Sequence, residues 1–191
     1  MKFLVLGLTG KRGCGKDTMA EYLQKNYGFR ILNFTNDVLG PILKEMGKEV
    51  TRENLIELAL NLREKNGNDI LAKMLSERIK ENNCKGFWVI SGIRYLEEVE
   101  YFKKTFGENF KLVKIECNIK KRYERIKNRG TKGEDSMSYK EFLEIEKRPT
   151  EKSIEKVMKL AEFSLDNNKK FEDFYRAIDD LMEKIKINLK G

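Results

Sequence analysis

Short, continuous apolar runs recur along the chain, and segments of mixed polarity separate them. The runs cover residues 3–8, 30–34, 87–90, 111–117 and 163–165. A continuous run of this length that ends in turn-forming residues is typical of a central parallel strand buried on both faces. We therefore expect five strands of one parallel sheet.

Helical spacing dominates between these runs. The first intervening segment has apolar or aromatic residues at steps of three or four, and residues 37–46, 52–65 and 69–80 give further helical patterns. Pro41 is compatible with a helix over 37–46 only if it lies in the first turn. Residues 138–141 form a capping box that opens another helix, and Pro149 marks a break between two helices. The C-terminal helix is indicated by Phe171, Phe174, Ile178, Leu181 and Ile185.

Strands that alternate with helices predict an α/β fold with a doubly wound parallel sheet and helices on both faces. At 191 residues the chain fits one domain, and we expect residues 1–191 to share one core. In such a sheet, ligands bind at the carboxyl ends of the strands. Candidate chemistry is therefore sought where each predicted strand ends.

Composition narrows the possible chemistry. The chain has no histidine, which excludes Ser-His-Asp and Cys-His machinery and histidine-ligated metal. Its three cysteines, Cys14, Cys84 and Cys117, lack paired spacing, which argues against a disulfide framework or a zinc cluster. The net charge of +8 favours polyanionic partners, but most of the lysines are scattered among glutamates, as on a solvated surface. No apolar run reaches the length of a membrane span, so we expect a cytoplasmic protein without a membrane partner.

A glycine-rich loop directly follows the first predicted strand. It comprises Gly10, Lys11, Arg12, Gly13, Cys14, Gly15, Lys16, Asp17 and Thr18. The pattern GxxxxGK between a strand and a helix is that of a P-loop, in which backbone N–H groups surround phosphate oxygens and the lysine reaches the β and γ phosphates. We therefore expect these residues to bind ATP and the fold to be a three-layer P-loop NTPase fold.

One position departs from the P-loop pattern. The pattern has Ser or Thr after the lysine to hold Mg²⁺, whereas Asp17 stands there and Thr18 follows. We expect Thr18 to contact a phosphate, and either residue to reach Mg²⁺ through water. Helix capping is the alternative interpretation of Asp17.

Residues near the ends of the second and third strands are candidates for an acceptor site, within an acceptor-binding region of about residues 35–82. Arg94 follows the third strand, where its guanidinium suits an acceptor phosphate; the alternative is a surface ion pair with Glu97 or Glu98. Asp37 follows the second strand and is either an acceptor or water-binding carboxylate or a helix cap. Arg63, on an intervening helix, is a further acceptor candidate, with a helix-surface role as its alternative.

A cluster of basic residues follows the fourth strand. Arg122, Arg125 and Arg129 are spaced i, i+3, i+7, so they share one helical face, and we expect them to stabilise the transferring phosphates. The alternative is neutralisation by Glu124 and Glu134 on a solvated helix. The polar stretch 130–136 resembles the tip of a closing lid, which we place at about residues 119–150. Arg148, beside Pro149, is a further candidate for the cleft.

These motifs resemble those of nucleoside monophosphate kinases. The sequence Gly15-Lys16-Asp17-Thr18 is similar to the GKGT of adenylate kinases and the GKDT of phage-type deoxynucleoside monophosphate kinases. Residues 34–39 resemble the acceptor-site STGDMLR, which implies acceptor roles for Thr35 and Asp37, although Gly40 replaces the closing arginine. Residues 91–94 resemble DGFPR, with Ser91 in place of the aspartate, which implies that Arg94 grips the acceptor phosphate.

The resemblance extends over nearly the whole chain to an archaeal family related to adenylate kinase and dephospho-CoA kinase. It is carried by residues 92–94, 121–125, 153–154 and 160–161. It implies a Mg²⁺- and ATP-dependent small-molecule kinase, with Lys16 and Arg122, Arg125 and Arg129 as catalytic residues. We expect a nucleoside or deoxynucleoside monophosphate as the acceptor. Dephospho-CoA kinase is the alternative enzyme, and a non-catalytic nucleotide- or RNA-binding protein is the alternative of another class, for which a stacking-rich basic motif is lacking.

Overall fold

The chain folds around a five-stranded parallel sheet, seen in a computed structural model that describes residues 3–129 and 137–188. The strand order is β2-β3-β1-β4-β5, so β1 is central and is flanked by β3 and β4. This order confirms the predicted doubly wound sheet. The strands are β1 Phe3–Thr9, β2 Arg30–Asn33, β3 Gly86–Ser91, β4 Phe110–Glu116 and β5 Phe163–Asp166.

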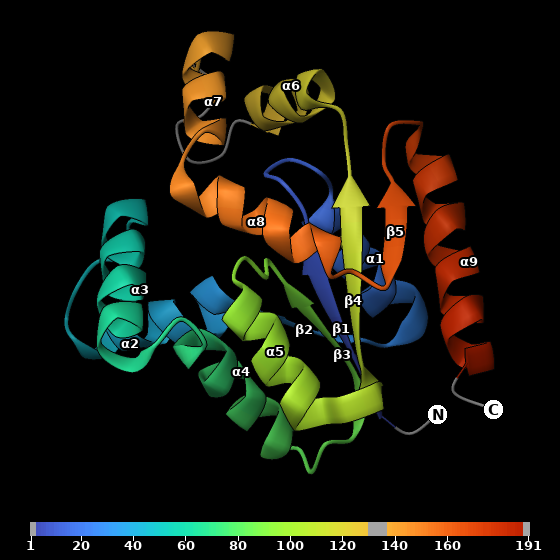
Figure 1. Cartoon of the computed structure of the whole chain (residues 1–191), viewed down its shortest axis with the longest axis horizontal. Coiled ribbons are helices and arrows are strands. Elements are labelled where there is room, and N and C mark those ends of the chain that lie inside the picture. The colour runs from blue at the N-terminus through green and yellow to red at the C-terminus, as the bar shows by residue number, and fades with distance from the viewer. Residues whose placement is uncertain (1–2, 130–136, 189–191) are drawn as a thin grey trace.

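Helices connect every pair of consecutive strands and cover both faces of the sheet (Figure 1). They are α1 Lys16–Tyr27, α2 Gly40–Glu45, α3 Arg52–Asn66, α4 Ile70–Lys80, α5 Leu96–Phe106, α6 Ile119–Arg129, α7 Tyr139–Glu146, α8 Pro149–Lys159 and α9 Phe171–Asn188. The predicted break at Pro149 separates α7 from α8. Residues 130–136, the predicted lid tip, lie outside the described residues.

Alternate side chains of β1 enter two different cores. Val5 packs with residues of α4, α5 and α8 on one face, whereas Leu4, Leu6 and Leu8 pack with residues of α1 and α9 on the other. All four of these β1 side chains are fully buried. The carboxyl ends of β1, β3 and β4 thus meet at one edge between the two helical layers.

The segment after β2 differs from the predicted helix over 37–46. It begins two residues earlier, as a π-helix over Thr35–Leu39, and continues as α2 with Pro41 in its first turn. The wide turn is closed by the Gly40 N–H, which donates to the Thr35 carbonyl five residues back. A Cβ at position 40 would lie 2.9 Å from the Thr35 oxygen, so the glycine permits this close approach.

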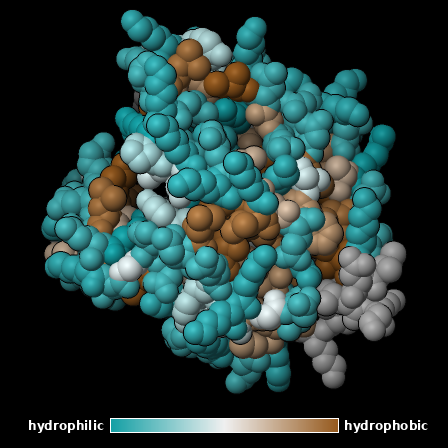
Figure 2. Space-filling model, viewed as in Figure 1, coloured by the Kyte–Doolittle hydropathy of each residue, from teal (hydrophilic) through white to brown (hydrophobic). Residues whose placement is uncertain are grey.

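The face shown in Figure 2 is largely hydrophilic, with hydrophobic side chains in separate patches, one at its centre and a smaller one beside α3. Exposed apolar residues on α3 and in the turn before it are Met46, Val50, Ile56 and Leu60. Within residues 3–129 and 137–188, no helix combines the length and apolar character needed to cross a membrane.

Candidate active site

The predicted P-loop connects β1 to the first turn of α1. Gly13 and Gly15 have φ values of 77° and 108°, a conformation that favours glycine. A Cβ on Gly13 would also lie 2.8 Å from the Arg122 carbonyl oxygen. The loop therefore needs glycine both for its backbone conformation and for its contact with α6.

Lys16 lies folded over the loop that precedes it. Its Nζ donates to the carbonyl oxygens of Gly10, at 2.7 Å, and Lys11, at 3.2 Å. The Cys14 Sγ atom lies 3.6 Å from the same nitrogen. The ammonium group is thus held against the concave side of the loop, and Thr18 follows in the first turn of α1.

Asn167 lies directly after β5 and is a site residue that the sequence alone did not reveal. Its side chain is buried, and its Nδ2 donates to the carbonyl of Cys14 at 2.8 Å. Its Oδ1 accepts from Arg125 Nη2 at 3.2 Å. Its position at the carboxyl end of a strand was the available signal, because that edge of the sheet is where ligand-binding residues gather.

Arg122 is built into the structure as a strut between the P-loop and α7. Its Nη1 and Nη2 atoms donate to the two carboxylate oxygens of Glu146 at 2.9 and 2.6 Å, and Nη1 also reaches the Arg12 carbonyl at 3.1 Å. The side chain is only 5% exposed. The carboxylate partner of Arg122 is Glu146, which lies 24 residues along the chain, and not Glu124, which the alternative interpretation had offered.

Arg125 and Arg129 have different surroundings from Arg122. Arg125 donates to the backbone and side-chain oxygens of Asn167, both at 3.2 Å, and its guanidinium lies 5.9 Å from the Phe171 ring centroid. Arg129 pairs with Asp17 at 3.4 Å, and both side chains are more than half exposed. The three arginines of α6 therefore reach the P-loop and α1 by separate routes.

Asp17 and Ser91 adjoin one another where β3 ends beside α1. The Ser91 hydroxyl donates to Asp17 Oδ1 at 3.3 Å. Among the described residues, no group of three or more acidic, cysteine or histidine side chains is arranged to hold a metal ion. An exposed carboxylate and a hydroxyl beside a phosphate loop fit a Mg²⁺ ion that keeps its waters and is held mainly by nucleotide phosphates.

Arg94 and Arg148 belong to a cluster that also contains Arg12 and Arg52, which we call the arginine cluster. Arg94 Nη1 lies 3.5 Å from the Glu151 Oε1 atom, so its side chain pairs with Glu151 and not with Glu97 or Glu98. Burial lowers the pKa of Arg12 to about 10; the charges of Arg52, Arg94 and Arg148 lower it as well, and Glu151 opposes them. The cluster unites the P-loop, the start of α3, the end of β3 and the start of α8.

Glu98 holds the backbone at Arg94 in place. Its Oε2 accepts from the N–H groups of Arg94 and Tyr95, and its Oε1 accepts from Arg63 Nη2 at 3.0 Å. Arg63, expected at the acceptor or on a helix surface, has a side chain only 12% exposed and packs over the Tyr95 ring. It connects α3 to the start of α5, behind Arg94.

Lys11 joins the P-loop to α8 through an ion pair. Its Nζ lies 2.8 Å from Glu155 Oε1. This ion pair lowers the pKa of Glu155. Glu151 and Glu155 are one turn apart on α8. The Lys11–Glu155 ion pair therefore holds the arginine cluster beside the P-loop.

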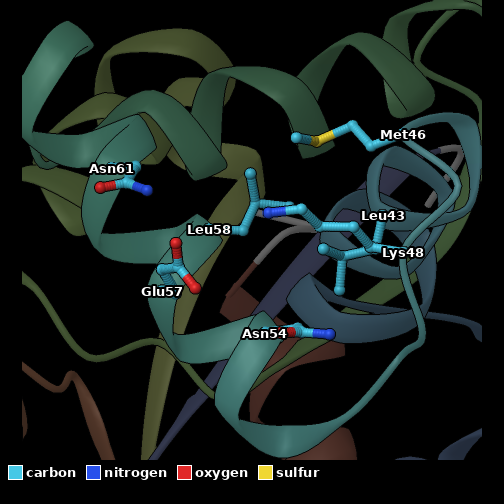
Figure 3. Close-up of a pocket in the computed structure, with 7 residues that line it drawn as sticks. All are labelled: Leu43, Met46, Lys48, Asn54, Glu57, Leu58 and Asn61. Carbon is cyan, nitrogen blue, oxygen red and sulfur yellow. The ribbon is translucent and has the colours of Figure 1, made fainter.

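Two hollows adjoin α2. One, of about 300 Å³, is lined by Thr35, Asn36, Gly40, Pro41, Lys44 and Val50. The other lies between α2 and α3 (Figure 3) and, at about 30 Å³, has room for about one water molecule. Asp37 accepts a hydrogen bond from the Asn33 N–H at 2.7 Å, so it closes the turn between β2 and the π-helix.

Comparison with known sequences places the chain in a family. A family model described as an AAA domain matches residues 6–149. A UPF0200 protein of Methanocaldococcus jannaschii is 35% identical over 188 residues, which cover 98% of this chain and 93% of that protein. A UPF0200/UPF0201 protein of Archaeoglobus fulgidus is 34% identical, and the chain spans 58% of its length.

Comparison with solved structures identifies the fold. Protein TT1252 from Thermus thermophilus has a TM-score of 0.61 at 20% identity, and a shikimate kinase from Bacteroides thetaiotaomicron has 0.59 at 13%; each match covers 96% of this chain and 98% of the other. A gluconokinase from Sinorhizobium meliloti has a TM-score of 0.53 at 11% identity, covering 97% of this chain and 96% of the other. The P-loop kinase-like fold is thereby confirmed. The chain belongs to the UPF0200 proteins, and its residues 6–149 are an AAA domain.

Proposed function

We propose that this protein transfers the γ-phosphoryl group of ATP to a small phosphorylated acceptor, with a nucleoside or deoxynucleoside monophosphate as the leading candidate. The observation that carries the proposal is the arginine cluster beside the P-loop, since Arg12 belongs to both. One anion site for the donor and a second for the acceptor are what phosphoryl transfer between two phosphorylated molecules requires.

On the donor side, the loop N–H groups and the N-terminus of α1 bind the phosphates. When ATP binds, Lys16 gives up its hydrogen bonds to the carbonyl oxygens of Gly10 and Lys11 and donates to phosphate oxygens instead. Asp17, Ser91 and Thr18 would hold a hydrated Mg²⁺, which would neutralise charge on the phosphates. Arg125 and Arg129 supply further positive charge, while Arg122 holds α6 against the loop.

On the acceptor side, Arg94 binds the acceptor phosphate with a planar guanidinium whose backbone is fixed by Glu98. The 300 Å³ hollow that contains Thr35 and Lys44 receives the rest of the acceptor, at the lower end of the range for ligand pockets. The structural neighbours include a shikimate kinase and a gluconokinase. Acceptors that carry a carboxylate in place of a phosphate are therefore the competing class.

A panel of acceptors tests this proposal. Purified protein with Mg-ATP is incubated with nucleoside and deoxynucleoside monophosphates, dephospho-CoA, phosphomevalonate, shikimate or gluconate, and acceptor-dependent ADP is measured. We expect a phosphorylated acceptor to stimulate ADP formation, and Lys16→Ala to abolish it while the circular dichroism spectrum is unchanged. Stimulation by shikimate or gluconate alone, or by none of the panel, would refute the proposal.

A further inference from the structure

Glu151 is the acidic member of an otherwise basic cluster. It lies in the first turn of α8, and Arg12 is under the electrostatic influence of Glu151 and of three other arginines, Arg52, Arg94 and Arg148. Among these arginines, Arg94 pairs with the Glu151 carboxylate. The segments that carry them are far apart in sequence, so the fold itself assembles this concentration of charge.

The Glu151 carboxylate is buried but poorly hydrogen-bonded. The residue is 4% exposed, and its Oε1 pairs with Arg94 at the long distance of 3.5 Å. Its Oε2 is buried and has no hydrogen-bond partner among the residues that the structure describes. A buried carboxylate usually has its lone pairs satisfied, because an unmade hydrogen bond costs free energy.

The Arg122–Glu146 pair shows what a structural ion pair looks like in the same molecule. There, two guanidinium nitrogens meet two carboxylate oxygens at 2.9 and 2.6 Å. Glu151 makes no such bidentate contact with Arg94. The contrast indicates that Glu151 balances the charge of Arg94 without locking its side chain in place.

We propose that Glu151 is the resident anion of the acceptor site: it pairs with Arg94 before the acceptor binds, and then competes with the acceptor for Arg94. This inference deepens the proposed function and rests on it for the identity of the site. A phosphate monoester carries up to two negative charges and three oxygens, so it displaces Arg94 from Glu151 readily. A monoanionic carboxylate only matches the charge of Glu151, so it displaces Arg94 from Glu151 less readily.

Binding of inorganic phosphate tests the role of Glu151. Titration calorimetry is performed with saturating ADP, so that the P-loop is occupied, and phosphate is compared with acetate. Removing one negative charge by Glu151→Gln is expected to tighten phosphate binding about tenfold and acetate binding by less, because the repulsion that is removed scales with the charge of the ligand. Because the arginines then repel one another, the melting temperature without phosphate is expected to fall. Added phosphate is expected to raise the melting temperature of the variant by more than it raises that of the wild type.

Two further variants keep the test decisive. Glu144→Gln makes the same change of net charge at an exposed pair with Lys147, and it is expected to leave phosphate affinity unchanged. Should Glu151→Gln fail to fold, Glu151→Asp keeps the charge but withdraws the carboxylate from Arg94, and about a twofold to threefold gain in phosphate affinity is expected.

Unchanged or weaker phosphate binding in both Glu151 variants, or equal tightening in Glu144→Gln, would overturn this inference. Failure of the inference about Glu151 can be distinguished from failure of the proposed kinase function. Acceptor turnover without any effect of Glu151 would refute only the inference. Tighter phosphate binding in Glu151→Gln, in a protein that turns over no member of the acceptor panel, would support the resident anion and refute the kinase proposal.

Discussion

At the scale of single residues, Asn167 supports the P-loop through a direct hydrogen bond. Its buried amide bonds the Cys14 carbonyl on one side and Arg125 on the other. The loop conformation therefore depends on a residue that follows the last strand of the sheet, 153 positions from its partner.

Asn167→Ala is expected to weaken nucleotide binding and to destabilise the protein. The substitution leaves the Cys14 carbonyl unpaired in the interior, a loss of about 1–3 kcal/mol. We expect a lower free energy of unfolding in urea and a larger Kd for ADP by calorimetry. The neighbouring Asn168→Ala is the matched control, since Asn168 bonds the Asn118 N–H and not the loop. Equal ADP affinity in Asn167→Ala and the wild type would contradict the assigned role.

At the scale of elements, the Arg122–Glu146 pair joins α6, α7 and the P-loop. The sequence indicated a run of arginines on α6, but it gave no sign that one would become a buried strut. The spacing i, i+3, i+7 fixes which residues share a helical face, whereas the partner of Arg122 is set by how α7 packs against α6. Local periodicity therefore could not distinguish Arg122 from Arg125 and Arg129.

Glu146→Gln is expected to destabilise the protein by about 3 kcal/mol, because it leaves the Arg122 guanidinium, 5% exposed, without its counter-ion. The free energy of unfolding in urea measures this loss. Glu144→Gln, on the same helix, removes an exposed pair in which each side chain is more than 60% exposed. It is expected to cost under about 0.5 kcal/mol. Similar losses in the two variants would show that Arg122 is not the strut described here.

At the scale of the whole molecule, the sheet and the P-loop follow directly from the sequence. Uninterrupted apolar runs located the five strands, and glycines directly after the first of them located the loop. The position of Arg94 after β3 also marked it as a candidate for the acceptor site. Arg52 and Glu151 were not identified, because both lie on helices whose approach to the loop depends on tertiary packing. The arginine cluster is a product of the complete fold.

Two separate anion sites, one in the P-loop and one in the arginine cluster, are the central claim about the molecule. Steady-state kinetics of Arg94→Ala, with a monophosphate that supports turnover, test it most directly. Loss of a charge-assisted contact of about 1.5–3 kcal/mol is expected to raise the KM for the acceptor about 10- to 100-fold. The KM for ATP is expected to change by less than about twofold, since the donor site is left intact. An acceptor KM that stays constant, or an ATP KM that rises as much, would contradict the two-site account.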